Sequence, residues 1–282
     1  AAHVPALTGF VDRALDPVDP AALAKLDLVF LATPHGAAKG LAAALVDAPL
    51  VVDASSDHRP PHGGGASGWV YGPPELVRER YVGAKRIAAP GCFATAIELA
   101  VGPFVKAGAV AGTVCVAAAT GSTGSGATPV AAAHHPVRFA NLRAYSVGQH
   151  RHGPEVLAFL ATLAASGEAP ALQFVPISAP LDRGIFATCF VPVAPGVDPV
   201  AIVADAYAGC PLIRLREGSP EVRHVRGTAL ADLAVHPRDG LATVLVAIDN
   251  IGRGAAAQAV QCANLALGLP EATGLFIPAC TP

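Results

Sequence analysis

The chain has 282 residues and a formal net charge of −2, with 52% hydrophobic and only 14% charged residues. This length allows one or two domains with an ample core, and the weak charge argues against a nucleic acid or an anionic membrane surface as the main partner. The apolar runs are too short to cross a bilayer, and we find no basic leader followed by an apolar segment. We therefore expect a cytoplasmic protein that acts on a small-molecule substrate.

The first predicted elements alternate in the order of a parallel sheet. Residues 27–33 form a short apolar run closed by a turn, which is typical of a buried strand. Residues 37–48 predict a helix and residues 49–57 the next strand, which completes a βαβ unit. Residues 58–68 are rich in Pro and Gly and predict a loop, and residues 85–91 predict a further strand and turn.

The rest of the chain predicts a second, mixed sheet. Helical patterns, the second led by a loop, cover residues 94–107, 146–165, 198–208 and 254–267. Strand patterns cover residues 112–120, 171–181, 184–194 and 223–250, the last with a turn at 237–240. The second and third of these strand segments could pair antiparallel, and the final helix could pack back on the first half.

Cys92 is the first candidate for chemistry, because it follows a Pro-Gly turn and precedes an apolar helix in AAPGCFATAIELA. A thiol at a helix N-terminus faces unpaired N–H groups and the positive end of the helix dipole. Both favour the thiolate, which is the nucleophile. The alternative is a packing role, since free cysteines are among the most buried residues. The other five cysteines form no CxxC pair and are expected to be reduced packing residues.

A thiol nucleophile usually needs a base, and His150 and His152 in GQHRHGPEV are the candidates. In an extended segment both imidazoles would line one cleft, with Arg151 turned aside; if a helical turn has begun, only one faces inward. Glu155 lies in the first turn of the following helix, where it could orient His152. A solvated loop is the alternative. Zinc is conceivable with Cys92, but no second cysteine or carboxylate has metal-like spacing, so no metal is expected.

Two further features suit an anion. The segment TGSTGSGA after a strand could expose backbone N–H groups as a nest for phosphate, with Ser122 and Ser125 adding hydroxyls; the alternative is a flexible connection. Arg183 lies at the mouth of a predicted strand, where its guanidinium could contact a carboxylate or phosphate in bidentate fashion. An ordinary surface arginine is the alternative there.

Several segments, in the same order along the chain, resemble the N-acetyl-gamma-glutamyl-phosphate reductase family. The resemblance covers residue 27 to the C-terminal end. The segments are FLATPHG, YGPPEL, IAAPGCFATAIELAVGP (87–103), HRHGPEV, APLDRGIFAT and AIDNIGRGAAAQAVQCANLALGLPEATGL (247–275).

This resemblance implies an NADPH-dependent enzyme of arginine biosynthesis that reduces N-acetyl-glutamyl 5-phosphate to N-acetyl-glutamate 5-semialdehyde. Cys92 matches the family's nucleophile, which forms a thioester, and the acid/base comes from the histidine pair. We favour His152 for that role, with His150 helping to bind the substrate. The resemblance also implies a homodimer or homotetramer. The remaining substrate-binding candidates are Arg151, Glu155, Arg183 and Ser122.

The cofactor contacts implied by the resemblance are drawn from both halves of the chain. Asn250 is expected to bond the nicotinamide carboxamide. The full set for NADP is Pro34, His35, Gly36, Ser55, Ser56, Gly124, Ser125, Gly126 and Asn250.

One departure from the family lies before residue 27, where ALTGFVDRALDPVDP contains no Gly-rich phosphate loop. Because the sequence has no Met, we expect an N-terminal portion to be absent from it. The predicted fold class is therefore α/β. A parallel Rossmann-like nucleotide domain, without its first strand and phosphate loop, takes residues 1–91 and 251–282. An α+β catalytic and oligomerisation domain with a mixed sheet takes residues 92–250.

Three other functions stay open from the sequence. An aspartate-semialdehyde dehydrogenase shares the thioester chemistry on a related plan, although the paired histidines and IDNIGRG favour the reductase. A cysteine hydrolase would use Cys92 and His152 without a nucleotide. A truncated, inactive fold would explain the missing phosphate loop. The preference for NADP over NAD is also open, because the residues that read the 2′-phosphate would lie in or near the absent segment.

Overall fold

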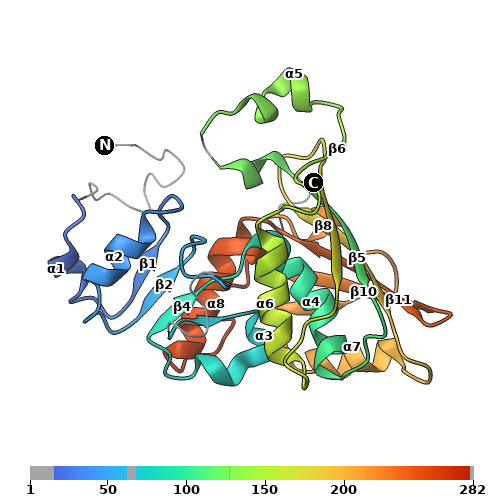
Figure 1. Ribbon diagram of the computed structural model, residues 1–282. Coiled ribbons are helices and arrows are strands. Elements are labelled where there is room, and N and C mark those ends of the chain that lie inside the picture. Colours follow the sequence, from blue (N-terminus) through green and yellow to red (C-terminus); the bar gives the residue numbers. More distant parts are fainter. Residues whose placement is uncertain (1–15, 62–67, 127, 280–282) are drawn as a thin grey trace.

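The computed structural model describes residues 16–61, 68–126 and 128–279 and contains two sheets with helices packed against them (Figure 1). The sequence analysis found no phosphate loop before residue 27, and the part of that segment up to residue 15 lies outside the described residues. Residues 62–67 of the predicted loop and Cys280 also lie outside them. In the part of the chain that is described, no helix combines the length and apolar character that a membrane crossing requires.

The smaller sheet is entirely parallel and has the strand order β1-β2-β4-β3. The predicted strands and the helix between the first two are confirmed, each shorter than predicted; β3 was not predicted. Its elements are α1 (Pro20–Leu23), β1 (Val29–Leu31), α2 (Ala38–Ala44), β2 (Val51–Asp53), β3 (Val70–Tyr71), α3 (Pro74–Val77), the 3₁₀ turn η2 (Arg78–Tyr81) and β4 (Arg86–Ala88).

The larger sheet is mixed and has the order β6-β7-β5-β8-β11-β10-β9. Its strands are β5 (Val114–Thr120), β6 (Arg143–Ala144), β7 (Leu172–Ser178), β8 (Ile185–Pro192), β9 (Ile213–Leu215), β10 (Ala231–Arg238) and β11 (Leu241–Ile248). The prediction that β7 and β8 pair with each other is wrong. The earlier strand β5 lies between them, parallel to β7 and antiparallel to β8, because its small and β-branched residues fill a central position.

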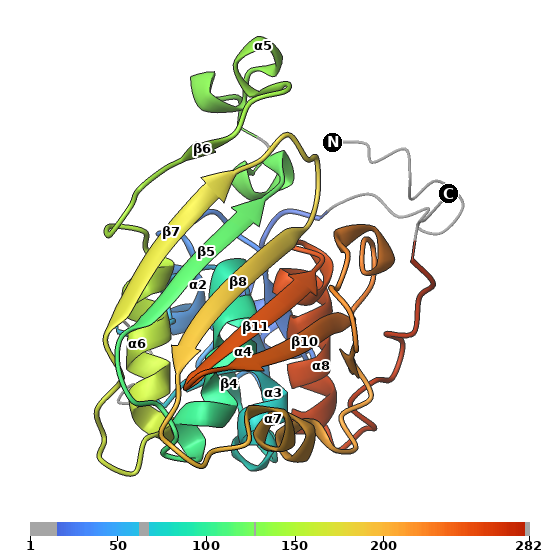
Figure 2. The same ribbon diagram turned by 90° about the vertical axis from the view of Figure 1, so that its right-hand side faces the viewer.

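Helices cover one face of the larger sheet, behind the strands in Figure 2. They are α4 (Cys92–Lys106), α6 (His152–Leu163) and α7 (Pro199–Tyr207). Helix α4 is apolar nearly all round, and it is buried because the sheet, α6 and α7 surround it. Helix α8 (Ala257–Ala266) follows a π-helical turn (Gly252–Ala256) and packs against β2 and η2. The predicted return of the last helix to the first half is therefore confirmed.

The other face of the larger sheet is open (Figure 2). Phe190 on β8 is 38% exposed there, and its cross-strand partner Cys115 is also exposed, which corrects the expectation that Cys115 is a packing residue. The segment with η4 (Ala131–Ala133) and α5 (His135–Arg138), which leads into the edge strand β6, projects beyond this sheet and exposes Phe139. The predicted domain boundaries stay a prediction: the small sheet and α8 fall in residues 1–91 and 251–282, and the large sheet in 92–250.

Candidate active site

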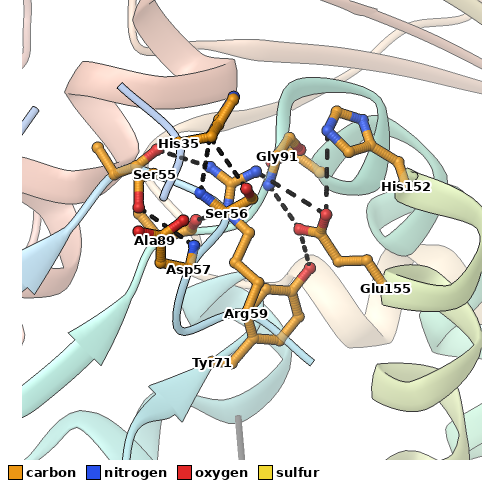
Figure 3. Close-up of polar contacts among 12 residues, drawn as sticks. His35, Ser55, Ser56, Asp57, Arg59, Tyr71, Ala89, Gly91, His152 and Glu155 are labelled. Atoms are coloured by element: carbon orange, nitrogen blue, oxygen red, sulfur yellow. Dashed lines mark hydrogen bonds and ion pairs between the residues drawn. The ribbon is translucent and has the colours of Figure 1, made fainter. Parts of the chain in front are cut away.

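The carboxyl ends of the parallel strands bring the predicted cofactor residues together. Since β1, β2 and β4 are parallel neighbours, the turns that follow them meet at one edge of the sheet. The Nδ1 atom of His35 lies 2.9 Å from Ser56 Oγ, and Ser56 N–H donates to the same nitrogen. The N–H of Gly36 donates to Asp57 Oδ1 over 2.7 Å. Residues 34–36 and 55–56 therefore lie side by side, near the turn that follows β4 (Figure 3).

Cys92 is the first residue of α4, directly after that turn. Gly91 has φ −72° and ψ 157°, and its carbonyl accepts the Thr95 N–H over 2.7 Å, which starts the helix. The π-helical turn presses against the same point: a Cβ on Gly254 would lie 2.7 Å from the Cβ of Cys92. The cysteine is thus held at a helix N-terminus, as predicted, by segments far apart in sequence.

The surroundings of Cys92 act on its thiol in two opposite directions. Burial raises the pKa of the Cys92 thiol, and it outweighs the opposing effects of the Arg59 guanidinium, the Phe93 N–H and Arg151. Burial therefore opposes the effect of the helix terminus, which the sequence predicted to favour a thiolate. A thiol in these surroundings depends on a nearby base to become a nucleophile.

A cavity of about 640 Å³ opens beside Cys92. Three arginines, Arg138, Arg143 and Arg151, line it together with His150 and His152, and no Asp or Glu is among its described lining residues. A cavity with this charge suits a small, anionic substrate.

Both histidines reach the cavity, although the helical turn has already begun. Arg151 has helical backbone angles (φ −53°, ψ −26°), and His152 is the first residue of α6. The ring centroids of His150 and His152 are nevertheless only 4.8 Å apart. Arg151 also lines the cavity and is not turned aside. Neither of the two arrangements considered from the sequence is therefore correct.

The surroundings lower the pKa of both imidazoles and so favour their neutral forms. His152 is 3% exposed, and its pKa lies well below the usual value because of burial, with Arg59, His150, Arg151 and His35 acting in the same direction. Burial, and then Arg151, lower the pKa of His150 to about 4. Neither ring nitrogen of His152 has a hydrogen-bond partner within the described residues. Both ring nitrogens are consequently available to a bound group or to the thiol.

Glu155 contacts His152 less directly than expected. Its Oε1 accepts the Gly91 N–H over 2.8 Å and lies 2.7 Å from the Tyr71 hydroxyl. Its Oε2 lies 3.9 Å from His152 Nε2, beyond hydrogen-bond distance, and 3.8 Å from Arg59 Nη1 (Figure 3). Glu155 thus holds the turn before Cys92 and places its negative charge beside the imidazole.

The Gly/Ser segment after β5 is only partly at the cavity. Residues Ser122–Ser125 form one 3₁₀ turn, η3, and Gly124 and Ser125 line the cavity. Ser122 is not among the lining residues, and its Oγ donates to the Asp182 carbonyl. Gly126, with φ +80°, ends the turn and does not line the cavity either.

Arg183 and Asn250 are committed to partners within the protein. The Nε of Arg183 donates to Asp249 Oδ2 over 2.6 Å, and the residue does not line the cavity. Asn250 is 3% exposed, its Oδ1 accepts the Gly184 N–H and its Nδ2 donates to Thr123 Oγ1. These contacts fix the turn after β5. Within the described ranges, no three His, Cys, Asp or Glu side chains are grouped so that they could hold a metal ion.

Comparison with known proteins places this site in a family. The chain is 44% identical over 294 residues to the N-acetyl-gamma-glutamyl-phosphate reductase of Salinispora arenicola (strain CNS-205), covering 99% of this chain and 86% of that protein. The chain belongs to the N-acetyl-gamma-glutamyl-phosphate reductase family. The reductase of Mycobacterium avium (strain 104) is 38% identical, with 99% of this chain and 85% of that protein covered.

Family models match both halves of the chain, and solved structures show a similar fold. Residues 1–84 match the model for the semialdehyde dehydrogenase NAD binding domain, and residues 92–250 match that for the semialdehyde dehydrogenase dimerisation domain. The crystal structure of aspartate semialdehyde dehydrogenase II from Vibrio cholerae in complex with ASA has a similar fold, with a TM-score of 0.70 at 16% identity, covering 87% of this chain and 81% of that one. The chain is therefore an oxidoreductase with a nucleotide-binding α/β half and a mixed-sheet second half.

The sequence did not single out every residue that shapes this reductase-family site. Arg59 is 6% exposed, and it donates to the Ala89 carbonyl over 2.7 Å and to the Ala54 carbonyl over 2.8 Å, so it ties the turns after β2 and β4 together. Its only signal was a positive charge shortly after a strand's carboxyl end, within a segment that predicts a loop. The other missed residues are Tyr71, Glu98, Arg138, Arg143 and Tyr145.

Proposed function

We propose that this chain reduces N-acetyl-glutamyl 5-phosphate to N-acetyl-glutamate 5-semialdehyde, with NADPH as reductant and release of phosphate. One observation carries the proposal: Cys92 at the N-terminus of α4 and the neutral His152 line the same cavity, beside the edge where the cofactor turns meet. The relatives named for this reaction, at 38–44% identity, support it.

The first half-reaction needs a base and an anion site. His152, whose ring nitrogens have no hydrogen-bond partner among the described residues, takes the proton from the Cys92 thiol. The sulfur then attacks the acyl carbon, the bond from that carbon to the phosphate oxygen breaks, and phosphate leaves. The product is a thioester on Cys92. The arginines that line the cavity bind the carboxylate and phosphate groups of the substrate.

The residues at the carboxyl edge fit a nicotinamide cofactor. Thr33 Oγ1, directly after β1, is buried and has no partner in the described part of the chain, so it is available to a bound group. When bound, the reduced nicotinamide supplies the hydride that reduces the thioester carbonyl. The protonated His152 gives its proton to the carbonyl oxygen, and then takes it back as the carbon–sulfur bond of the thiohemiacetal breaks and the aldehyde leaves. Cys92 regains its thiol proton.

The other candidate functions have less support. The likeness to aspartate semialdehyde dehydrogenases rests on 13–17% identity and carries the fold alone. An inactive fold has no support in the site, because the thiol, the base and the cofactor edge are brought together. The reduced state of the described cysteines also supports a cytoplasmic enzyme.

A homodimer or homotetramer is part of the same proposal. The open face of the larger sheet exposes Phe190, and the projecting segment exposes Phe139 and Leu142. Exposed apolar groups on one side of a monomer support an interface between copies of the chain. Replacing Phe190 with Glu is expected to lower the mass measured by light scattering to that of a smaller assembly, and an unchanged mass would contradict this interface.

The reverse reaction tests the function. N-acetyl-glutamate 5-semialdehyde, phosphate and NADP⁺ are expected to produce the absorbance of reduced nicotinamide, and the Cys92→Ala protein to produce none. Turnover of aspartate semialdehyde alone would favour the dehydrogenase. Comparing NADP⁺ with NAD⁺ by kcat/KM tests the cofactor preference, and a preference for NAD⁺ would overturn that part of the proposal.

A further inference from the structure

Glu98 is a carboxyl group in an unusual place. It belongs to α4, less than two turns after Cys92, and it is fully buried among apolar residues of the core. Its Oε1 lies 2.8 Å from the Tyr71 hydroxyl, and its Oε2 has no partner within the described residues. An ionised carboxylate with so few partners in a dry core is strongly disfavoured.

Counting protons decides how the three groups are bonded. The Tyr71 hydroxyl contacts Glu98 Oε1 over 2.8 Å and Glu155 Oε1 over 2.7 Å. A tyrosine has one hydroxyl proton, and an ionised carboxylate can only accept hydrogen bonds. One of the two contacts therefore requires a proton on a carboxyl group.

The surroundings place that proton on Glu98. Glu155, on α6, accepts the Gly91 N–H, and its Oε2 is 3.8 Å from the Arg59 guanidinium, so its charged form is compensated. No ion pair in the described ranges includes Glu98. The groups that act on it are the charge of Glu155 on α6, Tyr71 on β3, and Arg59 from the turn after β2. A charge on Glu98 would also raise the pKa of Tyr81 in η2.

We propose that Glu98 is a neutral carboxylic acid and a positioning residue: it donates to Tyr71, which donates to Glu155, and this chain holds the carboxylate behind His152. Burial is the main cause that raises the pKa of Glu98 well above its usual range, followed by the charge of Glu155, while Tyr71 and Arg59 oppose the shift. Each hydrogen bond in this series is therefore donated in the direction from Glu98 towards the active site.

The arrangement has a consequence for the reaction, which rests on the proposed function. Two donors, Tyr71 and the Gly91 N–H, occupy Oε1 of Glu155, which leaves Oε2 to face His152 and Arg59. When His152 takes a proton from the thiol, that oxygen is already placed to stabilise the imidazolium. Glu98 acts on the reaction only through this carboxylate.

Two measurements test the protonation of Glu98 without any turnover. At neutral pH, the infrared spectrum of Glu98→Gln is expected to lack one carboxylic-acid C=O band that the unmodified protein shows. The folded protein keeps a proton that the unfolded chain releases above the usual carboxyl pKa of 4.5, so the stability that Glu98 contributes falls as the pH rises from there towards its raised pKa. The melting temperature of Glu98→Gln relative to the unmodified protein is therefore expected to increase from pH 5 to pH 8. An unchanged band, or a difference that does not grow with pH, would overturn the proposal.

Turnover then tests the positioning role. Gln can donate an amide N–H to Tyr71 in place of the acid, whereas Leu cannot. Glu98→Leu is expected to lower kcat about tenfold with KM changed little, and Glu98→Gln to restore most of it. If both variants fail equally while the infrared band is lost, Glu98 is protonated but does not position Glu155. If the unmodified chain has no activity, the infrared and melting results still decide its protonation.

Discussion

Replacing Gly91 with Ala tests whether His152 acts as the base from its position beside Gly91. Gly91 has φ −72°, which alanine adopts without strain, so the backbone of the turn accepts the change. The added Cβ would lie 2.4 Å from His152 Nε2 and 2.7 Å from Arg59 Nη1. The substitution therefore displaces the imidazole and the guanidinium selectively and leaves the sulfur's own helix in place.

The size of the effect follows from that overlap. Two such atoms pack at roughly 3.5 Å, so the imidazole must move by about 1 Å. A displacement of about 1 Å in a catalytic group can lower the rate ~10²-fold, whereas overpacking of this kind costs about 1–3 kcal/mol of stability. We expect kcat of the reductase reaction to fall by that factor in a protein that still folds, as judged by circular dichroism and thermal melting.

Gly153 gives a matched control. It follows His152 in α6, and a Cβ there would meet nothing within 4 Å. Gly153→Ala is expected to keep its activity and to melt no lower than the unmodified protein. A folded Gly91→Ala protein with undiminished kcat would refute the assignment, since the base could not then be an imidazole in this position.

Three further predictions address the site. His152→Ala is expected to lower turnover by about 10²–10⁴-fold and His150→Ala by less; the reverse order would exchange their roles. Because burial raises the pKa of the Cys92 thiol above 9.0, its alkylation by iodoacetamide, followed by peptide mapping, should accelerate with pH and reach no plateau below pH 9.0; a plateau near neutral pH would show a thiolate at rest. Arg151 lines the cavity, so Arg151→Met should raise KM more than it lowers kcat, and an unchanged KM would exclude it from substrate binding.

Local sequence was enough to place Cys92 at the start of a helix. The Pro-Gly turn before Cys92 and the apolar run after it specify a helix start, and the structure begins α4 at that residue. Three strands of the parallel sheet were also predicted, because short apolar runs that end in turns are typical of buried strands. The turns at residues 34–36 and 55–56 were expected at the cofactor from the family resemblance, and the structure puts them side by side because the carboxyl ends of neighbouring parallel strands share an edge.

Contacts between distant segments could not be read in this way. Sequence patterns indicate where strands lie but not which strands pair with each other. The position of β5 between β7 and β8 was therefore not expected. Asn250 and Arg183 were expected at the ligand because they end or begin strands, and only the fold shows that Gly184 and Asp249 already bond to them. Arg59 lies in a segment that predicts a loop, and Tyr71 begins YGPPEL, which carried the family resemblance but no indication of a role for the tyrosine.

The sequence by itself determined which groups can react: a cysteine at a helix start and a pair of histidines before another helix, set in an α/β order. Only the tertiary structure decided which way their pKa values move. The helix terminus favours a thiolate at Cys92, but burial raises the pKa of its thiol. The same burial makes His152 a neutral base and raises the pKa of Glu98. Desolvation depends on everything packed around a group, and neighbours in sequence are only a small part of that surrounding.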